Sequence, residues 1–159
     1  MLAVTFMHEK SIMHRDLKLE NILCEEPIDG SNELIVKLTD FGFATHYDKN
    51  DRKKKPALGS PHYMAPEVVN ESFYDLKVDV WAVGIITFIL LTGRRPFNGI
   101  NGYLENAVYR DILETNPDYD KLLKNSSLSA RRFVKLALNK QCTHRPTAAE
   151  LLQNDWISD

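Results

Sequence analysis

Apolar residues are densest in the second half of the chain, and their spacing there predicts a long helix. Residues 80–91 are apolar almost all round, which is typical of a helix enclosed by other elements. The helical pattern begins at Leu76, Gly93 ends it, and Pro96 prevents it from resuming. The run is too short to span a bilayer, so we expect a buried core helix.

Weaker helical patterns lie on both sides of this run. Residues 2–7 are rich in apolar side chains and predict the last turns of an amphipathic helix that begins abruptly. Residues 103–113 carry apolar side chains at helical spacing and predict a surface helix. Ser129 is the expected N-cap of a further helix over residues 131–138. Together these patterns predict a mainly helical domain.

The C-terminal end of the chain carries the sequence signature of a helix start. Thr147 is followed three residues later by Glu150, which is the spacing of a capping box. We therefore expect a last helix that opens at Thr147 and continues through Leu152. Trp156 is expected to pack against this helix.

Two short strands are predicted before the helical part of the chain. Residues 22–24 and 34–38 are apolar, and turn-forming residues separate them. An antiparallel hairpin is the simplest account of this pattern. It would place Asn21 at the start of one strand and Asp40 just past the end of the other. The predicted fold class is therefore mainly α, an α+β fold with a small antiparallel β-hairpin.

Length and charge set limits on the partners of the chain. The 159 residues are enough for one domain with a sizeable core, and the net charge of −2 gives no reason to expect a nucleic-acid or membrane partner. Two cysteines without metal-ligand spacing, and no secretory signal in residues 1–10, predict the cytoplasm, with the nucleus as the alternative. The basic run 52–55 is more typical of a solvated loop than of a nucleic-acid or nuclear-localisation patch.

The candidate chemistry is concentrated in residues 14–21. Asp16, Lys18 and Asn21 bring a carboxylate, an ammonium and a carboxamide into one loop, where a tight bend lets them converge. A carboxylate accepts a proton, an ammonium offsets phosphate charge, and an amide oxygen is a hard metal ligand. The set therefore suits a substrate hydroxyl, a phosphate and a divalent metal. The competing interpretation is a charged surface loop without a function.

Further motifs favour the functional interpretation. Residues 14–16 read His-Arg-Asp, residues 40–42 read Asp-Phe-Gly, and residues 65–67 read Ala-Pro-Glu, which in this order is the known signature of protein kinases. From about Met1 to Trp156 the chain resembles the helical C-terminal lobe of a eukaryotic protein kinase. In three segments, 59–67, 79–84 and 91–97, the chain is most similar to calcium/calmodulin-dependent-type Ser/Thr kinases.

This resemblance implies a single domain, a protein-kinase C-terminal lobe over residues 1–159. The lobe would contain a catalytic loop (14–21), an activation segment (40–67) and a helical subdomain (68–157). The implied activity is transfer of the γ-phosphate of ATP to Ser/Thr hydroxyls of protein substrates, with Mg²⁺ as the metal. A calcium/calmodulin-type regulator, acting through parts outside this chain, is implied as a further partner.

The resemblance also implies roles for individual residues. Asp16 is similar to the catalytic base that accepts the proton of the substrate hydroxyl. Lys18 is similar to the lysine that contacts the transferred phosphate, and Ser60 to the hydroxyl that bridges this Asp and Lys. Asn21 and Asp40 are similar to the two Mg²⁺ ligands. The expected catalytic residues are thus Asp16, Lys18 and Ser60.

Leu23 resembles the residue beneath the adenine ring. The expected nucleotide-binding residues are therefore Lys18, Asn21, Leu23 and Asp40. The remaining matches are expected to be structural: an ion pair between Glu67 and Arg145, Asp79 as support of the catalytic loop, His14 and Phe41 in the hydrophobic column between the lobes, and Leu58, Pro61 and Met64 around the substrate residue after the phosphoacceptor.

The main departure from the family is the lack of a Gly-rich phosphate loop and of a strand lysine in the 159 residues. In the family, both belong to the N-terminal lobe. We therefore expect a fragment that binds ATP poorly and is inactive alone, with Leu23, Phe41 and His14 on an exposed apolar face. The alternative is a non-catalytic kinase-like binding module or a truncated regulator.

Two other departures concern regulation and specificity. In the family Arg15 usually meets a phosphate on a residue four positions before Ser60, and here that position is Pro56. We expect the kinase not to be switched by phosphorylation at the usual site. Glu20 is placed to attract a basic substrate residue, but Ile89 stands where some relatives carry an acidic residue, so the predicted basic preference is weak.

Overall fold

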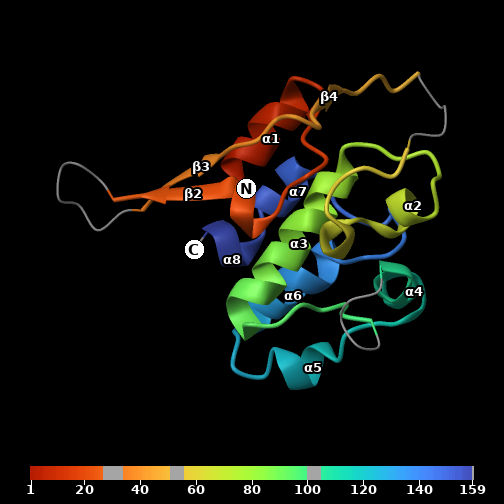
Figure 1. Cartoon of the computed structure of the whole chain (residues 1–159). Helices are drawn as coiled ribbons and strands as arrows, with labels where there is room; N and C mark the ends of the chain where they lie inside the picture. The colour runs from red at the N-terminus through yellow and green to blue at the C-terminus, as the bar shows by residue number, and fades with distance from the viewer. Residues whose placement is uncertain (27–33, 51–55, 100–104, 159) are drawn as a thin grey trace.

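Helices make up most of the chain, which confirms the predicted mainly α fold (Figure 1). The structure is a computed structural model that describes residues 1–26, 34–50, 56–99 and 105–158. Two small antiparallel sheets complete the described part. The described α-helices are α1 (Leu2–Glu9), α2 (Pro66–Val69), α3 (Lys77–Thr92), α4 (Glu105–Glu114), α5 (Tyr119–Leu122), α6 (Leu128–Ala137), α7 (Ala148–Leu152) and α8 (Asp155–Ser158).

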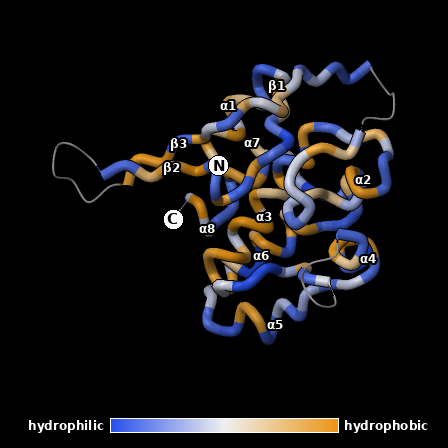
Figure 2. Tube along the Cα trace, viewed as in Figure 1, coloured by the Kyte–Doolittle hydropathy of each residue, from blue (hydrophilic) through white to orange (hydrophobic). Residues whose placement is uncertain are grey.

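Helix α3 is the centre of the fold, as the apolar run predicted. It passes through the middle of the helical body, and hydrophobic residues follow it along its length (Figures 1 and 2). Its large side chains Trp81, Ile85 and Phe88 are completely buried. Gly93 ends the helix with a φ of 67°, a left-handed conformation that glycine adopts without a steric penalty.

The predicted hairpin is present and projects from the helical body (Figure 1). Strand β2 (Ile22–Glu25) pairs with β3 (Ile35–Leu38), and Ile22 lies opposite Leu38. The strand limits differ by one residue from the prediction at Cys24 and at Leu34. The 3₁₀ helix η1 (Leu19–Asn21) ends where β2 begins, so Asn21 lies at the base of the hairpin, as expected.

A second sheet, which the sequence did not predict, joins the residues before the predicted catalytic loop to the predicted activation segment. Strand β1 (Ile12–Met13) pairs with β4 (Thr45–His46), with Ile12 opposite His46. Each strand has two residues, which is too short for an alternating pattern to show. The pairing holds the residues just before His14 beside the residues that follow Asp40.

The predicted start of α6 was wrong by three residues. The helix spans Leu128–Ala137, and Ser127 is its N-cap: the Ser127 hydroxyl oxygen accepts a hydrogen bond from the Ala130 amide at 3.1 Å. Ser129 lies inside the first turn, where its hydroxyl lies 3.0 Å from that of Ser127. The extended backbone of Ser127 selects it as the cap, and adjacent serines do not show this in the sequence.

The end of the chain was predicted in part. The capping box of Thr147 and Glu150 is confirmed and opens α7. Trp156, however, belongs to the separate helix α8, and its ring packs edge-on against Phe133 of α6 with centroids 5.1 Å apart. Helix α5 was not predicted, because four residues give no helical period.

Other predictions fall partly or wholly outside the described residues. Helix α4 confirms the predicted surface helix from Glu105 onward, while its predicted first residues, 103–104, are not described. The basic run 52–55 also lies outside the described part. Among the described helices, none is long and apolar enough to cross a membrane.

Candidate active site

A buried carboxylate on α3 fixes the backbone that leads to Asp16. Asp79 accepts hydrogen bonds from the backbone amides of His14 at 2.9 Å and Arg15 at 3.0 Å. The imidazole of His8 in α1 lies 2.9 Å from the same carboxylate. Arg15 has a φ of 68°, so the chain turns sharply at this point. The core helix thus fixes the backbone at the start of the predicted catalytic loop, as expected for Asp79, and His8 is a support that no sequence pattern revealed.

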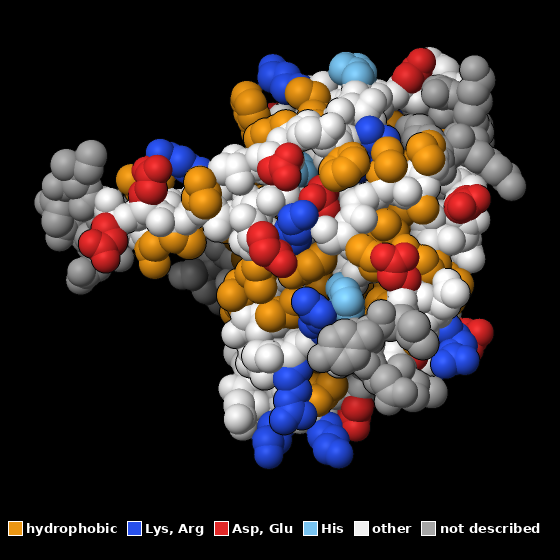
Figure 3. All heavy atoms as spheres, in the orientation of Figure 1, with side chains coloured by type: hydrophobic (Ala, Val, Ile, Leu, Met, Phe, Trp, Pro, Cys, Tyr) orange, Lys and Arg blue, Asp and Glu red, His pale blue; other side chains and the backbone are white. Residues whose placement is uncertain are grey.

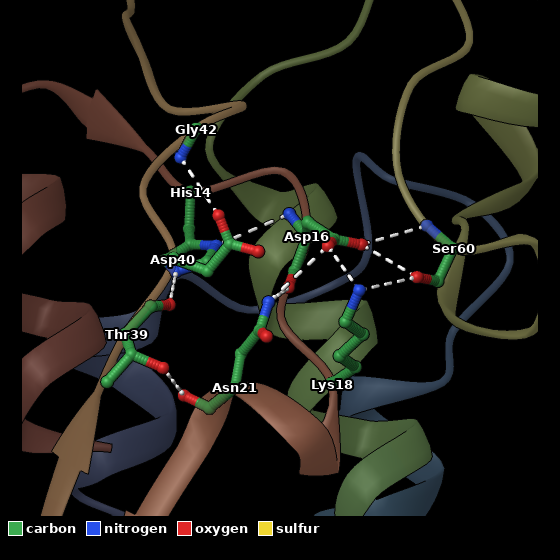
Figure 4. Close-up of polar contacts among 8 residues, drawn as sticks. All are labelled: His14, Asp16, Lys18, Asn21, Thr39, Asp40, Gly42 and Ser60. Atoms are coloured by element: carbon green, nitrogen blue, oxygen red, sulfur yellow. Dashed lines mark hydrogen bonds and ion pairs between the residues drawn. The ribbon is translucent and has the colours of Figure 1, made fainter.

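Asp16, Lys18 and Ser60 form one hydrogen-bonded cluster (Figure 4). The Lys18 ammonium donates to Asp16 Oδ2 at 2.7 Å. The amide and the hydroxyl of Ser60 both donate to Asp16 Oδ1 at 2.9 Å, and the Lys18 ammonium lies 3.2 Å from Ser60 Oγ. Asp16 is only 3 % exposed. The structure therefore brings together the three residues expected to be catalytic, although Ser60 is distant in sequence.

The cluster keeps Asp16 ionised. Burial raises the pKa of Asp16, but the hydrogen bonds from Lys18 and Ser60 and the Lys18 charge outweigh burial, and the net pKa is lowered. The hydrogen bond to Asp16 raises the pKa of Lys18, against the opposing effect of burial. Near neutral pH the site therefore holds a carboxylate able to accept a proton, beside an ammonium.

This lowered pKa predicts a pH-dependent stability. Since the folded pKa of Asp16 lies below the unfolded value of about 3.9, its stabilising contribution is present above that pH and is lost as pH falls through the folded pKa. We expect urea unfolding followed across this acid range to show a shallower loss of stability in Asp16→Asn than in the unmodified chain. Ser60→Ala removes only part of the cause and should give an intermediate slope. Equal slopes in all three proteins would contradict this assignment.

Asn21 and Asp40 are the candidate metal ligands. The Asn21 amide nitrogen donates to the Asp16 carbonyl oxygen at 2.9 Å, which fixes the orientation of the carboxamide. The Thr39 amide donates to the Asn21 carbonyl oxygen at 3.0 Å. Asp40 directly follows Thr39, so the base of the hairpin brings Asp40 close to Asn21. The Asp40 side chain is exposed, accepts a hydrogen bond from the Gly42 amide at 3.3 Å, and lies close enough to Lys18 to raise the pKa of its ammonium.

This donor set fits Mg²⁺. An exposed carboxylate and an amide oxygen are hard ligands, and Mg²⁺ is commonly held by one or two carboxylates together with substrate phosphates. No group of three or more His, Cys, Asp and Glu side chains in the described part of the chain could hold a metal by itself. Asn21 and Asp40 therefore suit a metal that arrives with phosphate oxygens.

Of the three residues expected on the exposed apolar face, Leu23 and Phe41 are exposed and His14 is not. Leu23 is 49 % exposed and Phe41 is 48 % exposed, and Figure 3 shows hydrophobic side chains on the surface of the hairpin and beside it. His14 is completely buried, so its predicted place on the exposed apolar face was wrong. The Phe41 ring covers it at a centroid distance of 4.9 Å, and its Nε2 lies 3.1 Å from the Thr39 carbonyl oxygen.

The activation segment is anchored by contacts that the sequence did not reveal. Arg15 Nε donates to the Phe43 carbonyl oxygen at 2.6 Å. The Tyr74 hydroxyl donates to the Pro56 carbonyl oxygen at 3.1 Å. Both acceptors are backbone atoms, and a backbone acceptor leaves no signature in side-chain identity.

The end of the segment is tied to the core by a buried ion pair. Arg145 donates to both carboxylate oxygens of Glu67, at 2.7 and 3.0 Å.

Leu58 and Met64 line a small cavity beside Asp16 and Ser60. Pro61 begins the 3₁₀ helix η2 (Pro61–Tyr63) and does not line this cavity.

Comparison with known proteins assigns the family. The model of the protein kinase domain matches residues 1–157. This chain belongs to the protein kinase family. The match covers nearly the whole chain, including Asp16 and Asp79.

The relatives agree with the resemblance found in the sequence, which is confirmed. The chain is 38 % identical over 158 residues to CDPK-related kinase 4 of Arabidopsis thaliana and 39 % identical over 158 residues to serine/threonine-protein kinase DCLK1 of Rattus norvegicus. It is 36 % identical over 160 residues to calcium-dependent protein kinase 4 of Plasmodium berghei (strain Anka). These alignments cover 98–99 % of this chain but only 25 %, 35 % and 28 % of the three relatives. The chain therefore spans about a quarter to a third of their length.

Proposed function

We propose that this kinase-family chain provides the catalytic loop and substrate platform of a protein Ser/Thr kinase, which transfers the γ-phosphate of ATP to Ser/Thr hydroxyls of proteins. The observation that carries the proposal is the cluster in which Lys18 and Ser60 both bind the buried Asp16 carboxylate. Phosphoryl transfer depends mainly on alignment and on charge stabilisation, and the cluster offers a base and a cation at one point.

In this proposal each side chain has a defined task. Asp16 orients the substrate hydroxyl and accepts its proton, because its lowered pKa keeps it ionised. Lys18 lies 2.7 Å from Asp16 Oδ2 and offsets negative charge on the transferred phosphoryl group. Ser60 holds Asp16 Oδ1 in place from the activation segment. Asn21 and Asp40 would hold Mg²⁺, which supplies charge neutralisation at the phosphates when it is bound.

The nucleotide itself needs further contacts. Leu23 is exposed on β2 and is the residue that we expect beneath the adenine ring. The 159 residues contain no Gly-rich phosphate loop and no strand lysine. We therefore propose that residues 1–159 act as the C-terminal lobe, with ATP bound between this lobe and a nucleotide-binding lobe. The alternative function, a non-catalytic binding module, makes no use of the Asp16 cluster.

Regulation is proposed to be independent of a phosphate at residue 56. Pro56 has no hydroxyl, and its carbonyl oxygen already accepts a hydrogen bond from the Tyr74 hydroxyl. The Arg15 guanidinium donates a hydrogen bond to the Phe43 carbonyl oxygen. The predicted activation segment is therefore anchored both before and after residues 51–55, which the structure does not describe. The proposed calcium/calmodulin-type regulator would act through parts outside these residues.

The proposed function can be tested by restoring a nucleotide-binding lobe. We would fuse the N-terminal kinase lobe of rat DCLK1 ahead of Met1 and supply Mg²⁺ and ATP with matched peptides that contain Ser, Thr or Tyr. We expect phosphate on the Ser or Thr peptide, little on the Tyr peptide, and loss of transfer when Mg²⁺ is chelated. A folded fusion protein that phosphorylates none of the peptides, or prefers Tyr, would overturn the proposal.

A further inference from the structure

A cationic side chain lies next to the turn that follows Ser60. This turn is η2, and His62 is its middle residue. His62 Nε2 accepts a hydrogen bond from Arg95 Nη1 at 3.2 Å. Ser60, directly before η2, donates twice to the Asp16 carboxylate. The Arg95 guanidinium is thus linked through one imidazole to the segment that contacts the proposed base.

The imidazole orients Arg95 without neutralising it. Burial lowers the pKa of His62, and the Arg95 charge lowers it further, so His62 is neutral near pH 7 and can act as an acceptor. A carboxylate in the same place would have cancelled the positive charge. Among the residues described, no carboxylate forms an ion pair with Arg95, and the side chain is exposed. The guanidinium therefore has charge and donors available to a partner.

A carboxylate, the opposite charge to Arg95, also lies near η2. Tyr63 is the last residue of η2, and its pKa is raised by burial and by the nearby Glu20 carboxylate, while Arg95 acts in the opposite direction. Both charges therefore act on one phenol. Glu20 and Arg95 are both exposed, and both lie near the Tyr63 side chain.

We propose that Arg95, oriented by His62, is a specificity-determining residue that binds an acidic side chain of the protein substrate. The inference rests on the proposed function, because Ser60, two residues before His62, contacts Asp16, the proposed base. A guanidinium held in one orientation can form paired hydrogen bonds to a carboxylate. The acidic residue would occupy a different position in the substrate from any basic residue that faces Glu20.

The test is direct binding of peptides to the 159-residue chain. Fluorescently labelled peptides would carry one Ser in a neutral background, with a single Asp moved through each flanking position. Fluorescence anisotropy at low salt should show one position, or two adjacent ones, at which Asp tightens binding by roughly threefold to tenfold. The Arg95→Gln variant should lose this advantage. Arg94→Gln is the matched control, since Arg94 is adjacent and also exposed, and it should keep the advantage.

Two further variants separate orientation from charge. His62→Ala removes the hydrogen-bond acceptor but leaves the Arg95 charge, so the advantage of Asp should shrink without disappearing. Arg95→Lys keeps the charge but loses the planar fork, and should also give a smaller advantage. High salt should reduce the effect in every protein that shows it.

Three results would show that Arg95 does not bind an acidic substrate residue. Absence of any Asp preference, persistence of the preference in Arg95→Gln, or no binding of any peptide would overturn the inference. The DCLK1-lobe fusion protein tests the proposed function separately. If it phosphorylates Ser peptides without an acidic preference, the subsite is wrong and the Ser/Thr kinase function stands. If it transfers no phosphate, the function itself fails.

Discussion

Replacement of Arg145 by Met is expected to lower the free energy of unfolding by roughly 3–5 kcal/mol. Arg145 is 1 % exposed and donates to both oxygens of the buried Glu67 carboxylate. It also donates to the carbonyl oxygens of Lys77 at 2.9 Å and Asn139 at 3.0 Å. Methionine has similar length but no donors, so Glu67 would be left buried and charged without a partner. The end of the activation segment would lose its attachment to the core.

Urea denaturation of the 159-residue chain measures this effect. The control is Lys135→Met, which breaks the exposed ion pair with Asp120 and should cost no more than about 1 kcal/mol. The double variant Glu67→Gln/Arg145→Met should be more stable than the sum of the single effects predicts, because it leaves no unpaired charge. A loss of stability in Arg145→Met as small as in Lys135→Met would contradict the buried ion pair.

Replacement of Asp16 by Asn is expected to lower kcat of the DCLK1-lobe fusion protein by roughly 10²–10⁴-fold, the usual contribution of a positioned general base. Asparagine keeps the size of the side chain but cannot accept a proton from the substrate hydroxyl. It also cannot bind the Lys18 ammonium through a charged oxygen, a contact that is 2.7 Å long in the structure. The substitution would therefore remove the proposed base, Asp16, and also change the position of the Lys18 ammonium, which is proposed to face the phosphate.

Steady-state phosphorylation of a Ser peptide checks this prediction. Ser60→Ala is the informative companion, because it removes one of the contacts to Asp16 Oδ1 and leaves the carboxylate and the backbone contact from residue 60. We expect a loss of kcat in Ser60→Ala that is clearly smaller than in Asp16→Asn. Equal kcat for Asp16→Asn and the unmodified fusion protein would show that Asp16 is not the base.

Long elements with a clear hydrophobic pattern could be predicted from the sequence, and several elements of two to four residues, such as β1, β4 and α5, could not. The apolar run at 80–91 gave the position of α3, because a buried helix of this length has few alternatives. The capping box at Thr147 gave the start of α7, because its two side chains satisfy backbone donors in a fixed spacing. Strands β1 and β4 have two residues each, and long-range pairing rather than local preference determines them.

The site was predictable through motifs and not through spacing alone. Ser60 lies 44 positions after Asp16, and only the resemblance to kinases indicated that the two would meet. His8 was missed because a histidine in an amphipathic helix has no signature that points to Asp79. His14 was placed on the exposed face because it resembles a member of the hydrophobic column between the lobes, but Phe41 covers its ring, and the residue is completely buried.

The contact on which the proposed acidic subsite rests was also beyond the sequence. Arg95 and His62 are 33 positions apart and belong to different motifs, and no local pattern joins them. Their contact depends on the packing of η2 near the segment that follows α3. The sequence pointed to Glu20 as a charged residue near the predicted catalytic loop. The structure adds Arg95, a cation whose effect on the pKa of Tyr63 is opposite to that of Glu20.

The central claim is that these 159 residues carry an intact catalytic loop that needs a nucleotide-binding lobe in order to act. The most direct measurement compares phosphate transfer to a Ser peptide by the purified 159-residue chain and by the DCLK1-lobe fusion protein at equal concentration, with Mg²⁺ and ATP. We predict no appreciable transfer by the chain alone and clear transfer by the fusion protein. Robust transfer by the chain alone, or none by a folded fusion protein, would contradict the claim.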